Sequence, residues 1–334
     1  MTEFLDACYA AILKQETSIG NTIAAADDRA VEVLKDKRLI VLTGCGDSYA
    51  VADYGKWAFL KVGLNAVQVS PPELSQIQLD EDCAVIGISA SGRSLATIDA
   101  MKKARTAGVM TIVLTDNTEG AASELADYIW TTRAGVDSYN ISPSSITTTA
   151  MAYLLKLAGG LQTMPRTRIQ NDINGLKCIG KKMLDWAESV GKKIAEVPMR
   201  GKPLFMISEG ANYAAAQIGM MKFNEYGVFQ STAALAEDFQ HHHVLTANQD
   251  DGAVLITQSP HKKEDMKYLR ALNDTLRMKA FHLFTPQELN LDSALGQAIA
   301  NSIALQMAAY YNVLKYDSEK KHWKQPNVDA FKIY

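Results

Sequence analysis

Short apolar runs alternate with longer amphipathic stretches through the first half of the chain. Each apolar run is six or seven residues long and ends at a small or polar residue, which is typical of a buried strand. The predicted strands are 38–44, 65–70, 83–89, 110–116 and 126–132. Helical periodicity is found at 47–63, 94–107 and 146–163, with further helix before residue 36. Alternating strands and helices predict an α/β fold with a parallel, doubly wound sheet.

The second half of the chain repeats this pattern. The segment 39–50 pairs with 204–215, and within it Gly46 matches Gly210 and Tyr49 matches Tyr213, each 164 positions later. Further along, 82–89 pairs with 251–258, and 109–115 pairs with 279–285. Both the order and the spacing of the strands recur, so we infer an internal duplication of one αβα unit.

The duplication suggests four segments. We expect a helical segment at 1–36, a first αβα domain at 37–165, a helical connector at 166–200 and a second αβα domain at 201–334. The charged stretch 261–270 has the pattern of a solvated helix face.

Composition narrows the function classes. The 334 residues carry a formal net charge of −3 with both signs dispersed, which argues against a nucleic-acid or membrane-surface partner. The first sixteen residues lack a long apolar core, so we expect neither a signal peptide nor a membrane span. Four cysteines without a CxxC pair suggest a reduced, cytoplasmic setting.

Three hydroxyls follow the third predicted strand. Ser89, Ser91 and Ser94 surround Gly92 just before a helix begins, where unpaired N–H groups and the helix dipole favour an anion. A helix cap needs one serine, so this set predicts a site for a phosphate monoester. The first strand ends in "TGCGDS" at 43–48, which lacks the third glycine of a dinucleotide loop, and no P-loop is found. We therefore expect no nucleotide or nicotinamide cofactor.

These motifs resemble the SIS (sugar isomerase) domain family. The resemblance rests on "TGCGDS", "GISASGRSLATIDAMKKARTAG" and "VLTD", and the duplicated arrangement is similar to the isomerase half of glucosamine-6-phosphate synthase and its stand-alone relatives. It implies a phosphosugar substrate and no metal. The implied substrate-binding residues are Ser48, Ser89, the backbone of Ala90, Ser91, Ser94 and Ser142.

The stretch 220–244 carries the candidate acid–base residues. Glutamate suits proton transfer between C1 and C2 of a sugar when burial raises its pKa, and histidine suits ring opening near neutral pH. Glu225 and His241 have the sixteen-residue spacing of the base and ring opener in the resembled synthase, whose histidine comes from the neighbouring subunit. Lys222 matches a lysine of the same motif.

Two further residues are alternatives within this stretch. Glu237 and His242 would take the catalytic roles if the correspondence slipped by one position. The run "HHH" at 241–243 has no matching Cys/His cluster elsewhere, so we do not expect a metal site there.

The C-terminal tail and the subunit arrangement complete the resemblance. The tail "KQPNVDAFKIY" is similar to the synthase tail, which makes Lys332 a candidate for the reaction centre, with a role in Schiff-base formation or proton donation. Sites shared between subunits imply a homodimer or homotetramer.

Departures from the family pattern leave the reaction open. Asp47 replaces a threonine, Arg93 replaces an acidic residue, and the lysine expected after Ser142 is missing. Asp47 could contact a substrate amine or hydroxyl. Without a glutaminase domain or an N-terminal cysteine, we expect either aldose–ketose isomerisation or deaminase or deglycase chemistry on an amino-sugar 6-phosphate. A non-catalytic sugar-phosphate sensor is the alternative from a different class.

Overall fold

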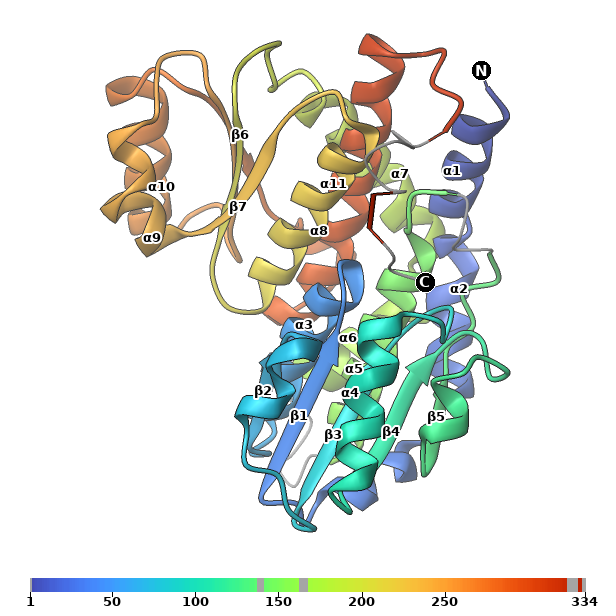
Figure 1. The fold of residues 1–334 in the computed structure, drawn as a ribbon. Helices are drawn as coiled ribbons and strands as arrows, with labels where there is room; N and C mark the ends of the chain where they lie inside the picture. The colour runs from blue at the N-terminus through green and yellow to red at the C-terminus, as the bar shows by residue number, and fades with distance from the viewer. Residues whose placement is uncertain (1, 137–140, 162–167, 323–329, 332–334) are drawn as a thin grey trace.

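A five-stranded parallel sheet forms the first half of the protein (Figure 1). The computed structural model describes residues 2–136, 141–161, 168–322 and 330–331. The strand order is β2-β1-β3-β4-β5, and every neighbouring pair is parallel. The strands are β1 (Leu39–Gly44), β2 (Ala66–Val69), β3 (Cys83–Ile88), β4 (Met110–Thr115) and β5 (Tyr128–Thr131).

A second parallel sheet has four strands in the order β7-β6-β8-β9. They are β6 (Leu204–Ser208), β7 (Ser231–Leu235), β8 (Gly252–Ile256) and β9 (Lys279–Leu283). In both sheets the first strand in sequence lies between the second and the third, so the topologies match and the predicted pair of α/β domains is confirmed.

The duplication extends to backbone conformation. Gly46 directly precedes α3 (Asp47–Lys61) and has φ 55°, and Gly210 directly precedes α8 (Ala211–Tyr226) and has φ 58°. A side chain disfavours this region, which explains why both halves keep glycine where the strand turns into the helix.

The strands alternate between two apolar layers because neighbouring side chains point to opposite faces. In β1, Ile40 and Leu42 join the central core, whereas Val41 packs with α4 (Leu95–Thr106). In β6, Met206 faces the central core and Phe205 faces α9 (Ala236–His241) and α10 (Lys263–Arg270). One helical layer therefore serves both sheets.

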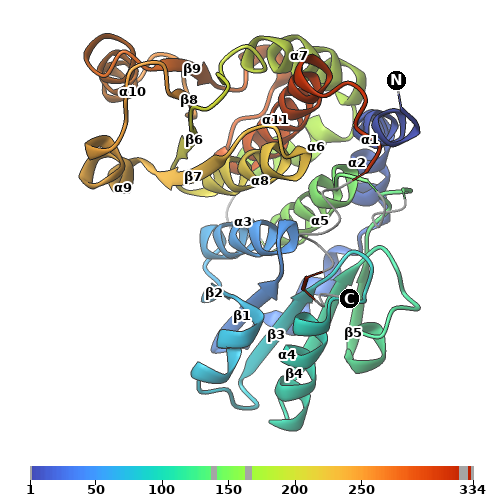
Figure 2. The ribbon, with the colours of Figure 1, turned by 45° about the horizontal axis from the view of Figure 1, so that its top comes forward.

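The shared layer contains α3, α5 (Ser145–Gly160), α8 and α11 (Ala294–Tyr316). Figure 2 shows α3 and α5 between the first sheet and α8, and α3 packs directly on α8. This contact brings helices that follow the first strand of each half against one another.

The remaining helices complete this core. They are α1 (Glu3–Leu13), α2 (Gln15–Ala25), α6 (Arg168–Leu176) and α7 (Gly180–Ile194), which correspond to the predicted N-terminal and connector helices. Neither α11 nor β7 was predicted from the pattern. The α11 helix is buried on nearly every side, so its sequence lacks a clear amphipathic period. Within the described residues, no helix is both long and apolar enough to cross a membrane.

Gly191 permits a close approach of α7 to α11. A Cβ at this position would lie 2.6 Å from Met307 Cβ and 3.0 Å from the Ala308 nitrogen. Alanine normally gains about 1 kcal/mol over glycine in a helix, but here the helices must separate. We expect Gly191→Ala to lower the free energy of unfolding by about 1–3 kcal/mol, measured by denaturant titration.

The matched control is Ser189→Ala, at an exposed position of the same helix. It should change the free energy of unfolding by less than about 0.5 kcal/mol. A Gly191→Ala protein as stable as the parent would contradict the close packing.

Candidate active site

The loop after β3 carries Ser89, Ser91 and Ser94 and is called the hydroxyl loop below. The loop after β4 holds it in one conformation. Gly92 has φ 67°, and a Cβ on it would lie 2.8 Å from the Gly120 Cα. The Ala122 N–H donates to the Gly92 carbonyl at 2.9 Å, and Asn117 Nδ2 donates to the Ser91 carbonyl at 3.0 Å. Only glycine satisfies both the dihedral angle and the close approach at this position.

Hydrogen bonds fix the side chains of Ser91 and Ser94 near the start of α4. Thr97 Oγ1 donates to Ser94 Oγ at 3.2 Å, and Ser94 Oγ lies 3.5 Å from Cys45 Sγ in the loop after β1. The Arg93 N–H donates to Ser91 Oγ at 3.3 Å. Ser94 is the residue before the helix, so the first N–H groups of α4 face the same region.

Sequence reasoning missed Thr97, Cys45 and Asn117 as neighbours of this loop. Thr97 lies three residues after Ser94, a spacing that places two residues on one helix face. That spacing was a usable signal for Thr97. Cys45 and Asn117 come from other loops, so only the fold brings them here.

A narrow cavity joins the loops after β1 and β3. Asp47, Ser48 and Ala90 line it together with residues from the end of β4 and the start of α5. Three of the predicted substrate-binding positions therefore lie around one cavity at the carboxyl ends of the strands, where ligands bind in open α/β sheets.

A buried ammonium group connects this cavity to the second half. Lys222 on α8 has a side chain only 1% exposed, and its Nζ lies 2.7 Å from Asp47 Oδ2. The same Nζ lies 2.9 Å from Glu225 Oε2. Ser142 Oγ donates to Glu225 Oε2 at 2.7 Å. The structure thus brings four predicted site residues into one hydrogen-bonded group.

These charges change one another's protonation. Burial raises the pKa of the Glu225 carboxyl to about 7, with the negative charge of Asp47 acting in the same direction and Lys222 and Ser142 opposing it. Burial alone would lower the pKa of Lys222, but Asp47 and Glu225 outweigh it, so the net shift is upward. The result is a permanent cation beside a carboxyl that gains and loses its proton near neutral pH.

The N-terminal helix α1 contacts the hydrogen-bonded group of Asp47, Ser142, Lys222 and Glu225 through Cys8. The Ser142 N–H donates to Cys8 Sγ at 3.4 Å, and burial raises the pKa of that thiol. Cys8 was not predicted as a site residue. Its place on the apolar face of α1 carries no local signal that it would lie beneath Ser142.

The predicted histidine lies elsewhere in this chain. His241 is on α9 with its side chain 79% exposed, and its Nε2 is 3.5 Å from Glu237 Oε2. Among the described residues, no hydrogen bond or ion pair joins either of them to Glu225. His242 is also exposed, and its ring centroid lies 4.4 Å from that of His243. Lys332 lies outside the described residues.

No group of three metal-ligating side chains gathers in the part of the chain that the structure describes. The site is instead made of a hydroxyl loop and a carboxylate–ammonium group at the strand ends of an α/β domain. Such an arrangement defines a class of α/β protein with hydroxyl and N–H donors at a helix start beside an acid–base group at the strand ends.

The chain belongs to the SIS domain family, whose model matches residues 33–158 and 200–279. It is 25% identical over 295 residues to the glutamine–fructose-6-phosphate aminotransferase [isomerizing] of Clostridium tetani. That match covers 81% of this chain and 48% of the relative, so the chain spans about half of that protein's length.

Solved structures share the fold at low identity. The C-terminal domain of glucosamine-fructose-6-phosphate aminotransferase from Francisella tularensis has a TM-score of 0.78 at 16% identity, covering 92% of this chain and 95% of that one. Glucosamine-6-phosphate deaminase from Thermotoga maritima has a TM-score of 0.72 at 16% identity, covering 93% and 95%.

Ser91→Ala tests the hydroxyl loop as an anion site. We expect it to weaken binding of glucitol 6-phosphate by about 1–2 kcal/mol, because a hydrogen bond to a charged group is lost. This ligand has no carbonyl to isomerise, so titration calorimetry measures binding alone. Ser75→Ala, at an exposed position, is the control. Unchanged affinity in the Ser91 variant would remove the phosphate assignment.

Proposed function

We propose that this protein is a phosphosugar-processing enzyme that moves a proton between neighbouring sugar carbons and releases an amine from a 6-phosphorylated amino sugar. The observation that carries the proposal is the Glu225 carboxyl, with a pKa of about 7, hydrogen-bonded beside the buried Lys222. A general base is most effective when its pKa lies near the working pH. Strongly shifted carboxyls in a cleft mark functional sites more often than structural ones.

Asp47 joins the binding loop to the base. It lines the cavity with Ser48 and Ala90, and it also accepts a hydrogen bond from Lys222, which in turn reaches Glu225. The cavity itself holds only about 20 Å³, so a sugar held by its phosphate at the hydroxyl loop reaches the carboxylates only if the lining of the cavity moves apart.

The free oxygen of Asp47 favours an amine-bearing substrate over a plain hexose phosphate. Asp47 Oδ1 is buried, and among the residues that the structure describes it has no hydrogen-bond partner, whereas Oδ2 is paired with Lys222. A buried acceptor without a partner is costly, and a substrate ammonium or hydroxyl would satisfy it. The ammonium is preferred because it is also attracted by the negative charge of the carboxylate. The names of the Thermotoga maritima and Clostridium tetani relatives, a deaminase and an aminotransferase, agree with this preference.

The proposed reaction needs one base and one water. Glu225 removes the C2 proton of the open-chain amino sugar, and the resulting enamine takes a proton at C1 to become a ketimine. Water then adds to C2, the C–N bond breaks, and a ketose 6-phosphate and ammonia leave. In this scheme His241 of the partner subunit opens the sugar ring, which requires a homodimer or larger assembly. Plain aldose–ketose isomerisation would use the same base without the loss of nitrogen.

Glucosamine 6-phosphate is the first substrate to test. We expect the purified protein to release ammonia and form fructose 6-phosphate, followed by an ammonia assay and proton NMR. Glu225→Gln should lower turnover by at least about 100-fold, the usual contribution of a general base, and still bind glucitol 6-phosphate. Asp185→Asn, on the exposed face of α7, is the control. Isomerisation of glucose 6-phosphate without ammonia release from the amino sugar would refute the deaminase assignment.

The pH profile reports the state of Glu225. The base acts as the carboxylate, so kcat/KM should rise with pH through about 7 and level off above it, because the pKa of Glu225 is about 7. Asp47→Asn removes a neighbouring negative charge that raises this pKa. The rising limb of the variant should therefore move to lower pH, even if the variant is slower. A limb at the same pH would show that Asp47 does not act on the base.

A further inference from the structure

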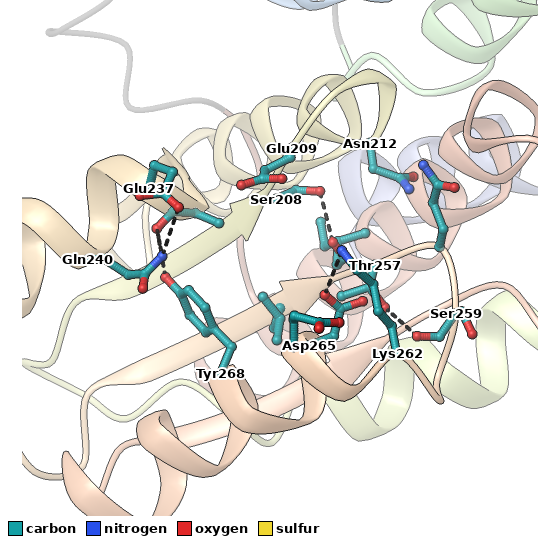
Figure 3. A pocket seen from close by; sticks show the side chains of 15 residues that line it. Ser208, Glu209, Asn212, Glu237, Gln240, Thr257, Ser259, Lys262, Asp265 and Tyr268 are labelled. Carbon is teal, nitrogen blue, oxygen red and sulfur yellow. Dashed lines mark hydrogen bonds and ion pairs between the residues drawn. The ribbon is translucent and has the colours of Figure 1, made fainter.

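A larger cleft lies at the carboxyl end of the second sheet (Figure 3). Its volume is about 640 Å³, and it is formed by the ends of β6 and β8 together with α8, α9 and α10. Because the two sheets have the same topology, this second-domain cleft occupies the place that the hydroxyl loop occupies in the first domain. Ligands of open parallel sheets bind at this end. The proposed function does not use it.

The second-domain cleft has lost the chemistry of the phosphate loop. When 82–89 is aligned with 251–258 and continued without a gap, the positions of Ser89, Ser91 and Ser94 are taken by Gln258, Pro260 and Lys263. The loop therefore no longer offers three hydroxyls around a glycine, and the duplicated cleft is not a second copy of the first site.

Acidic side chains line the second-domain cleft in place of the three serines of the hydroxyl loop. The four acidic residues that line the cleft are Glu209, Glu237, Glu264 and Asp265. One lysine, Lys262, also lines it, and its Nζ lies 3.8 Å from Asp265. Burial first, and then the negative charges of Glu209 and Glu237, raise the pKa of Tyr268. Four carboxylates and one lysine give the lining a negative charge, which repels a phosphate and attracts a cation.

The buried side-chain amide of Asn212 supplies a hydrogen-bond donor with a fixed orientation. Asn212 is only 2% exposed and lines the cleft. Thr285 Oγ1 donates to Asn301 Oδ1 at 3.1 Å, and Asn301 Nδ2 donates to Asn212 Oδ1 at 3.1 Å. This relay determines which way the Asn212 amide faces. Among the described residues, none accepts a hydrogen bond from Asn212 Nδ2, so that donor is left for a ligand.

The rest of the lining suits a polyol. Gln240, Thr257 and Ser259 add amide and hydroxyl groups, and Figure 3 shows Tyr268 between Gln240 and Asp265 along one side. The Tyr268 hydroxyl donates to the Ala236 carbonyl at 3.0 Å, which holds the ring in place. A fixed ring beside several polar groups matches the two faces of a sugar, and the volume of the cleft exceeds that of one monosaccharide.

We propose that the second-domain cleft binds a monosaccharide-sized polyol that carries an ammonium group and no phosphate. The ammonium lies against the carboxylates of Glu209 and Glu237, and Asn212 Nδ2 donates to a ring or hydroxyl oxygen. Glu237 is also the partner of His241, at 3.5 Å. An ammonium bound to Glu237 would compete with His241 for that carboxylate, which places the ligand within reach of α9.

The test compares two sugars that differ at one group. Titration calorimetry at about pH 6.5, where alkylammonium groups stay protonated, should show that D-glucosamine binds at least tenfold more tightly than D-glucose. Glu209→Lys, at an exposed position, should abolish glucosamine binding, and Glu209→Gln should weaken it at least fivefold. Asp185→Asn is the remote control and should bind normally.

Two further measurements distinguish binding in the second-domain cleft from binding at the first-domain site. Glucosamine binding should survive Ser91→Ala and should not be displaced by glucitol 6-phosphate. Equal affinity for the two sugars, no detectable binding of glucosamine, or loss of binding in Ser91→Ala would overturn the proposal. None of these outcomes depends on turnover, so the proposal and the proposed enzymatic function fail or stand separately.

Discussion

The buried ammonium of Lys222 is the interaction on which the arrangement of the site depends. An isolated ammonium in the interior would cost several kcal/mol, so it must be paired. Its partners come from both halves of the duplicated chain: Asp47 begins α3, and Glu225 lies in the last turn of α8. The ion pair therefore holds the first domain's strand-end cavity next to the second domain's carboxyl. The same burial that requires the pairing also keeps Glu225 close to half-protonated at neutral pH.

Buried polar contacts extend this coupling to the N-terminal helices. Gln15 on α2 donates to Gln306 on α11 at 2.9 Å and accepts from Thr148 on α5 at 2.6 Å. Such contacts leave few alternative packings, because a shifted helix would leave a buried amide without its hydrogen-bond partners. Cys8 on α1 accepts from the backbone of Ser142 in the same region. The helices outside the two sheets are thus part of the layer that carries the site.

Duplication produced one scaffold with two different clefts. Both halves keep a glycine with positive φ before the helix that follows the first strand, which preserves the turn. The side chains at the strand ends are free to differ because they do not support the sheet. The first sheet has serines before the helix that follows its third strand, and the second has a cleft with carboxylates around a buried amide. The two copies therefore keep the same backbone geometry but differ in the side chains that would contact a ligand.

Local patterns in the sequence determined the strands, most helices, the duplication and the hydroxyl loop, since each depends on residues a few positions apart. The pairing of Lys222 with Glu225 also follows from their spacing on one helix turn. Tertiary structure alone decided that Asp47, Ser142 and Cys8 meet this pair, because α3, α5 and α1 reach it only through packing against α8 and α11. It also decided the pKa of Glu225, which depends on burial and on charges distant in sequence. The α11 helix escaped prediction for the same reason: it is buried on nearly all sides, and a helix without a solvent-facing polar side has no clear period to detect.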